Sequence, residues 1–210
     1  MRDWWIRTLL VLQRPRPVFV ALRDDSRASL GDRAEPVLAI VILGGIAWAL
    51  STGTAAHLMD DDDYDAVTVA IWAFIVGGVY GMFGYFALGA ILHRAVRVLG
   101  SQGTYRRTRH VLAFAAVPLV VSLAAWPVKL ALFGGDAFRS GGEDAGADGT
   151  AFVVVEAVFL AWALGLLVVG VRAVHGWTWA RAAGAVALAA AGAATIVAAI
   201  EIAARGWPTS

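Results

Sequence analysis

The sequence predicts an all-α, polytopic membrane protein: a bundle of five transmembrane helices preceded by an amphipathic segment at the membrane interface. Three observations support this fold class. Hydrophobic residues make up 60% of the 210 residues and charged residues only 16%, whereas soluble domains carry roughly 25% charged residues. Five stretches are long and apolar enough to cross a hydrocarbon core about 30 Å thick. The basic residues also gather in alternate connections, as membrane topology requires.

The expected spans are residues 36–56, 66–92, 111–134, 151–171 and 182–204. The first carries no charge, and the second exceeds the length that a bilayer requires, so it should tilt or extend beyond the core. The third contains Pro118 and Pro127, and we expect a helix kink at one or both prolines because each removes a backbone hydrogen bond. The fifth is rich in alanine and should pack against the other helices.

Residues 1–35 form the segment before the first span. Residues 3–12 and 18–22 are mainly apolar and are interrupted or flanked by arginines, with Trp4 and Trp5 at the start. This pattern predicts a short helix lying in the interface. The sequence Arg-Pro-Arg-Pro at residues 14–17 should break it into two pieces, because proline cannot continue a helix.

The distribution of arginine predicts the orientation. Fourteen of the seventeen basic residues fall in residues 1–35 and in the second and fourth connections, whereas the alternate loops at 60–65 and 134–150 are acidic and should be solvated. Because cytoplasmic segments retain lysine and arginine, the N-terminus should lie in the cytoplasm, with residues 205–210 as a short external tail. One lysine against sixteen arginines, with abundant alanine, glycine and valine, favours a bacterial source and hence the plasma membrane.

Several function classes are excluded by what the sequence lacks. It has no cysteine and no His-Glu-x-x-His or Gly-x-Ser-x-Gly motif, and its four histidines do not stand at metal-ligand spacing. We therefore expect no catalytic site, no cofactor and no metal site. The absence of a basic domain likewise argues against a nucleic-acid partner.

Small residues on two spans predict close helix packing. Gly77 and Gly81 stand four residues apart on the second span, and Ala161 and Gly165 do so on the fourth. Such pairs let helix backbones approach closely. We expect them to pack within the chain, and the alternative is a face where two copies of the chain meet.

The second connection supplies a candidate contact surface. It contains five arginines: Arg94, Arg97, Arg106, Arg107 and Arg109. Each could bind anionic headgroups, worth about 1 kcal/mol near a membrane surface. The alternative is that they bind a protein partner, either another membrane protein or a second copy of this chain.

Three charged side chains lie inside the spans: Lys129, Glu156 and Glu201. With a rise of about 1.5 Å per residue, all three reach a similar depth in the outer leaflet. Ionised groups at this depth need a partner or a route to the interface. Either Lys129 pairs with one of the glutamates, or each side chain reaches the outer interface separately.

Two stretches resemble the Yip1 domain family, in particular its bacterial members. Residues 99–119 read LGSQGTYRRTRHVLAFAAVPL, a short basic loop leading into a helix with an aromatic-small-x-x-Pro-Leu pattern. Residues 171–177, VRAVHGW, with Arg181 and Ala182, resemble the family's fourth connection. The resemblance covers roughly residues 8–204 and implies a five-helix bundle with a cytoplasmic N-terminus. The chain lacks the acidic N-terminal region and Asp-Leu-Tyr-Gly-Pro motif of the eukaryotic members, so their association with small GTPases is not carried over.

These observations together predict a non-enzymatic membrane scaffold or accessory protein that acts through protein or lipid contacts at its basic cytoplasmic face. The alternative is a small permease or channel component. A transporter needs polar groups facing a cavity at mid-bilayer. The mid-span positions here are mostly alanine, glycine, valine, leucine and aromatic residues, which favours the scaffold.

Overall fold

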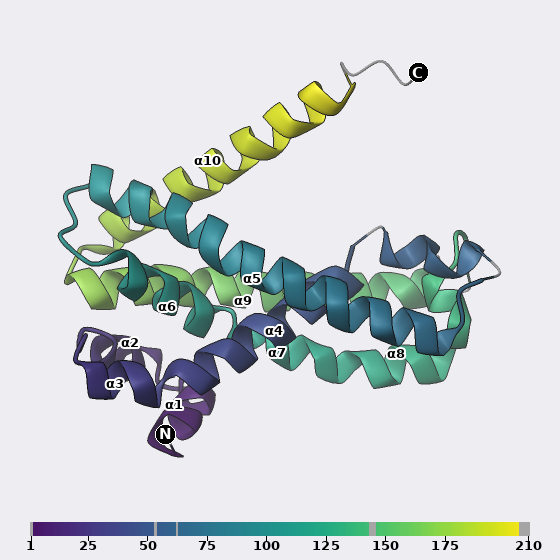
Figure 1. The fold of residues 1–210 in the computed structure, drawn as a ribbon, viewed down its shortest axis with the longest axis horizontal. Helices are drawn as coiled ribbons and strands as arrows, with labels where there is room; N and C mark the ends of the chain where they lie inside the picture. Colours follow the sequence, from purple (N-terminus) through teal and green to yellow (C-terminus); the bar gives the residue numbers. More distant parts are fainter. Residues whose placement is uncertain (1, 53, 62, 143–145, 206–210) are drawn as a thin grey trace.

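The protein is a helical bundle in the computed structural model, which describes residues 2–52, 54–61, 63–142 and 146–205 (Figure 1). These residues contain no strand. The α-helices are α1 (Arg2–Leu10), α2 (Pro15–Ala21), α3 (Arg27–Asp32), α4 (Ala34–Leu50), α5 (Ala66–Val98), α6 (Tyr105–Ala115), α7 (Val117–Ser122), α8 (Trp126–Phe133), α9 (Ala147–His175) and α10 (Trp179–Arg205). Three 3-10 helices connect them: η1 (Ala55–Asp60), η2 (Leu123–Ala125) and η3 (Gly134–Phe138).

Within the described residues, five helical runs are long and apolar enough to span a membrane, which confirms the predicted fold class. They cover Arg27–Leu50, Ala66–Val98, Tyr105–Phe138, Gly149–His175 and Trp179–Arg205. Large apolar side chains project outward from the long helices, as lipid-facing residues do; examples are Phe74 and Phe83 on α5 and Val153 on α9. The chain is therefore a multi-pass membrane protein.

The first span ends earlier than the sequence predicted. Helix α4 stops at Leu50 rather than at residue 56. The hydroxyl of Ser51 donates to the carbonyl of Ala47 at 2.9 Å, and the hydroxyl of Thr52 donates to that of Ala49 at 2.6 Å. Such bonds compete with the backbone ladder and favour a helix end, so the chain leaves α4 here and continues into η1.

The two ends of the bundle differ in charge. At one end lie residues 2–33 with α1 to α3, the last turns of α5 with α6, and the last turn of α9 with the first turn of α10; we call this the basic end, because it holds fourteen arginines. At the other end lie η1, residues 61 and 63–65, and η3; we call this the acidic end. Asp62, Glu143 and Asp144, which belong to the predicted acidic loops, lie outside the described residues.

The described segment before α4 forms three short helices, of which α1 and α2 are the predicted pair, and it contributes to the bundle's core. α1 ends at Leu10 and α2 begins at Pro15, so the break falls at the Arg-Pro-Arg-Pro sequence. Phe19 and Leu22 are fully buried against the bundle, and Trp4 packs against Phe114 with ring centres 5.6 Å apart. The apolar face of α2 is therefore covered by protein.

Helices α4 and α5 approach each other backbone to backbone. A Cβ atom added at Gly45 would lie 2.1 Å from the carbonyl oxygen of Gly77, and one added at Gly81 would lie 2.1 Å from that of Val41. Gly77 and Gly81 thus serve packing within the chain, as predicted. The same prediction is wrong for Gly165, whose added Cβ would meet open space because it faces outward on α9.

The third span is divided into segments at its prolines. α6 ends at Ala115, Ala116 caps both α6 and α7, and Pro118 lies in the first turn of α7. Pro127 likewise lies in the first turn of α8, after the short η2. Each proline stands where its missing N–H costs no helical hydrogen bond.

Helix α10 joins the bundle through its N-terminal half. Its buried residues are Ala182, Ala185 and Val186, which pack near α5 and α9. Ala189 still packs against the core and Gly192 approaches Ile91, and beyond these residues α10 leaves the bundle at an angle to α5 (Figure 1). Ile196, Ile200 and other apolar side chains are exposed along this part.

Candidate functional site at the basic end

Asp25 is the centre of an ionic clamp that holds the N-terminal segment on the bundle. Its Oδ2 accepts a hydrogen bond from Nη2 of Arg107 at 2.6 Å, and its Oδ1 lies 3.4 Å from Nη2 of Arg33. Arg107 also donates to the carbonyl of Arg23 at 2.8 Å, and the hydroxyl of Thr104 donates to Asp25 at 3.4 Å. One carboxylate therefore joins the loop after α2 to the start of α4 and to α6.

Arg33 is the most deeply placed charge of this clamp. Its side chain is 0% exposed, and its Nε and Nη1 have no hydrogen-bond partner among the described residues. The guanidinium lies 5.7 Å from the centre of the Trp4 ring, within cation–π range. Because a buried charge is costly without a counter-ion, Asp25 is essential to this arrangement.

A second aspartate beside the clamp shapes the loop. Asp24 accepts the backbone N–H of Ser26 at 2.9 Å. This bond lowers the pKa of the Asp24 carboxyl, because it stabilises the ionised form. Ser26 in turn caps α3 by accepting the N–H of Ser29.

Arg109 is held inside the protein by aromatic rings. Its guanidinium carbon lies 4.9 Å from the ring centre of Tyr85, 4.5 Å from that of Phe86 and 4.5 Å from that of Tyr105. Its side chain also crosses Gly89, where an added Cβ would lie 2.5 Å from its Cγ. Arg109 thus ties α6 to α5.

The five arginines proposed from the sequence therefore fall into two groups. Arg107 and Arg109 are half-buried and engaged within the chain. Arg94, Arg97 and Arg106 are exposed, and they form no ion pair with any residue that the structure describes. We call these three the exposed arginine patch.

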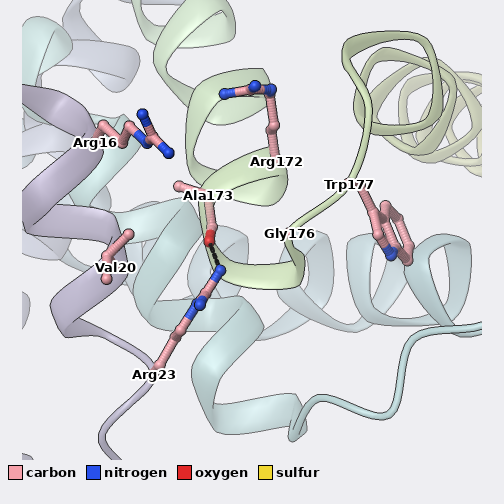
Figure 2. Close-up of a pocket in the computed structure, with 7 residues that line it drawn as sticks. All are labelled: Arg16, Val20, Arg23, Arg172, Ala173, Gly176 and Trp177. Carbon is pink, nitrogen blue, oxygen red and sulfur yellow. Dashed lines mark hydrogen bonds between the residues drawn. The ribbon is translucent and has the colours of Figure 1, made fainter.

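A pocket of about 350 Å³ lies at the same end, between α2 and the last turn of α9 (Figure 2). Seven residues line it: Arg16, Val20, Arg23, Arg172, Ala173, Gly176 and Trp177. Arg23 donates through Nε to the carbonyl of Val174 at 3.1 Å and through Nη2 to that of Ala173. Sequence reasoning did not assign this pocket. The only signal was the arginine between two prolines at position 16.

The α9–α10 turn is fixed by contacts to the second connection. Gly176 caps α9 with φ +67°, a left-handed conformation that glycine adopts without strain. The ring Nδ1 of His175 lies 3.2 Å from the hydroxyl of Ser101. Arg181 donates through Nε to the carbonyl of Leu99 at 3.1 Å and stacks over Trp177 at 4.3 Å. These contacts hold Gly176 and Trp177, two of the residues that line the pocket, in place.

The three charges within the spans are not gathered in one place. Glu156 lies beside the hydroxyl of Ser51 and within the electrostatic range of Lys129. Lys129 also lies 5.0 Å from the centre of the Trp126 ring. Glu201 is exposed on the part of α10 that leaves the bundle (Figure 1). Lys129 and Glu156 therefore interact electrostatically, whereas Glu201 lies exposed near the end of α10.

A separate cluster joins the two loops of the acidic end. Asp60 accepts the backbone N–H of Ser140 at 2.7 Å and also its hydroxyl, and His57 contacts both residues. The hydrogen bonds from Ser140 lower the pKa of the Asp60 carboxyl. The pKa of Asp65 is lowered likewise, because it caps α5 by accepting the N–H of Thr68 at 2.8 Å. His57, Asp60 and Ser140 are solvent-exposed, and their contacts join η1 to the residues that follow η3.

The fold and the charge distribution define a multi-pass helical membrane protein with one basic and one acidic end. The model of the Yip1 domain matches residues 9–200, nearly the whole chain. The chain therefore belongs to the Yip1 domain family, which confirms the resemblance seen in the second and fourth connections. No curated protein and no solved structure matches it significantly.

Proposed function

We propose that this protein is a non-enzymatic scaffold or accessory subunit of a bacterial plasma membrane. In this proposal the basic end faces the cytoplasm, and the protein acts there through contacts with other proteins or with lipid. The arginine distribution supports the orientation, because cytoplasmic segments retain basic residues.

The observation that carries the proposal is the contrast between the two groups of arginines in the second connection. Arg107 and Arg109 form contacts within the chain that hold the elements of the basic end together. Arg94, Arg97 and Arg106 project from this end into solvent. A surface whose exposed arginines form no ion pair with any described residue is suited to binding an anionic partner by electrostatic complementarity.

Site-specific photocrosslinking in native membranes tests the proposal. A photoreactive residue replaces Arg97 in the full-length protein, and the matched control carries it at Asp63, exposed at the acidic end. We expect discrete protein or lipid adducts from position 97 that are absent from position 63. Neutralising Arg94 and Arg106 in the same chain should reduce these adducts.

Two results would contradict the proposal. Equal and diffuse crosslinking from both positions would mean that the basic end has no dedicated partner. Solute flux in proteoliposomes above an empty-vesicle control would favour the alternative, a small permease or channel component.

A further inference from the structure

The pocket at the basic end has an unusual charge distribution. Three of its seven lining residues are arginines, and none is acidic. Arg16 lies on α2, whereas Arg172 lies on α9, and Figure 2 shows their guanidinium groups directed toward each other across the space above Ala173. Two like charges facing one gap repel each other, and an anion placed between them would remove that repulsion.

Neither of these two arginines is neutralised within the described part of the chain. Arg16 is exposed, and neither side chain takes part in an ion pair there. The Nε of Arg172 is buried without a hydrogen-bond partner among the residues that the structure describes. Its guanidinium is held in place by the Trp179 ring, whose centre lies 4.4 Å away. Stacking of this kind orients the guanidinium while leaving its edge available for hydrogen bonds.

Arg23 has a different role in the same pocket. The last carbonyls of α9 are a centre of partial negative charge, which would repel an anion. Arg23 donates to two of these carbonyls, those of Ala173 and Val174. It therefore covers the part of the wall that is least compatible with an anionic ligand.

The size and position of the pocket indicate the source of the anion. At about 30 Å³ for each water-sized group, the volume of about 350 Å³ holds on the order of ten heavy atoms. This is more than inorganic phosphate has and close to a glycerol-phosphate headgroup. The pocket also lies where the fourth span ends, at His175, and Val20 gives it an exposed apolar wall.

We propose that Arg16 and Arg172 form a binding site for the phosphate group of an anionic phospholipid. Guanidinium groups bind phosphate oxygens through paired, charge-assisted hydrogen bonds. The inference rests on the proposed function, since it takes the basic end to act by contact. It adds a lipid site that is distinct from the exposed arginine patch.

Native mass spectrometry of the full-length protein with phosphatidylglycerol tests the site. An arginine that contacts the lipid phosphate should contribute roughly a fivefold change in binding. The Arg16→Gln variant should therefore bind about fivefold more weakly, and the double variant Arg16→Gln/Arg172→Gln about 25-fold more weakly. The matched control Arg14→Gln/Arg27→Gln removes the same charge from exposed positions at the same end, outside both the pocket and the exposed arginine patch, and we expect its affinity to stay within about threefold of the wild type. Circular dichroism checks that each variant is folded, and Arg16→Gln serves if the double variant is not, because Arg16 is exposed.

Three results would overturn the inference. Unchanged phosphatidylglycerol binding by Arg16→Gln would show that the pocket is not the site. Equal losses in the test and control double variants would show that only overall surface charge matters. Displacement of the lipid by millimolar inorganic phosphate would assign the site to a soluble phosphate. Crosslinks from position 97 that persist in any of these cases would leave the proposed function standing.

Discussion

The α4–α5 contact predicts a sharp difference between two neighbouring glycines of α5. A Cβ atom at Gly81 would lie 2.1 Å from the carbonyl oxygen of Val41 and 3.0 Å from its carbonyl carbon. A Cβ atom at Gly78, one turn away on the same helix, would meet nothing within 4 Å. Alanine at these two positions is therefore the same chemical change in opposite surroundings.

The loss of folding free energy expected for Gly81→Ala follows from the neighbouring atom, which is a backbone atom of Val41 on α4. The obstructing atom belongs to the backbone of α4, so the helices must separate by about 1 Å, and a gap of that size forfeits a quarter to a half of the dispersion attraction at each contact. Overpacking of this kind costs typically 1–3 kcal/mol, and we expect Gly81→Ala to lie near 3 kcal/mol. For a chain of this length such a loss lowers the melting temperature by on the order of 10 °C.

Thermal unfolding of the purified protein in one detergent checks this difference. Gly78→Ala should melt at the wild-type temperature or above it, because alanine favours a helix by about 1 kcal/mol over glycine. Gly81→Ala should melt well below it. Equal melting temperatures for the two variants would refute the close approach of α4 and α5.

Three further predictions concern charged groups. Asp25→Asn should destabilise the protein by about 3–5 kcal/mol, measured by chemical unfolding, because it leaves the fully buried Arg33 without its counter-ion. The control Asp24→Asn should have little effect, because Asp24 is exposed. Because the pKa of Asp60 is lowered, the contact between Asp60 and Ser140 should persist as the pH falls through the ordinary carboxyl range, and it should open only below that range. Ser140→Ala should raise the pKa of Asp60, measured by NMR titration. Substituting Lys129 and Glu156 by Met and Gln, singly and together, should reveal a coupling energy above about 0.5 kcal/mol, and additive effects would mean that the two side chains are independent.

The spans were predictable because their signal is local. Twenty consecutive apolar residues must cross a bilayer in helical form whatever lies beside them. The same holds for the interrupted third span, since Pro118 and Pro127 act on their own helix. The end of α4 at Leu50 was missed, because it depends on hydroxyl-to-carbonyl bonds from Ser51 and Thr52, which hydropathy does not register.

The candidate site was only partly predictable, because it depends on contacts between distant residues. The sequence located a basic connection, yet nothing in it separates Arg107, whose partner Asp25 is 82 residues away, from the exposed Arg106. The pocket joins Arg16 to Arg172, residues brought together only when α2 packs on α9. The pattern of small residues was likewise ambiguous: Gly81 meets α4, whereas Gly165 meets open space.

The orientation of the basic end in the membrane is the central claim, and labelling of single cysteines tests it most directly. The chain contains no cysteine of its own, so one can be placed at Gln102 in the basic end and another at Ser140 in the acidic end, both at exposed positions. In intact cells an impermeant thiol reagent should label position 140, and it should label position 102 only after the membrane is opened. Labelling of position 102 in intact cells would contradict the account.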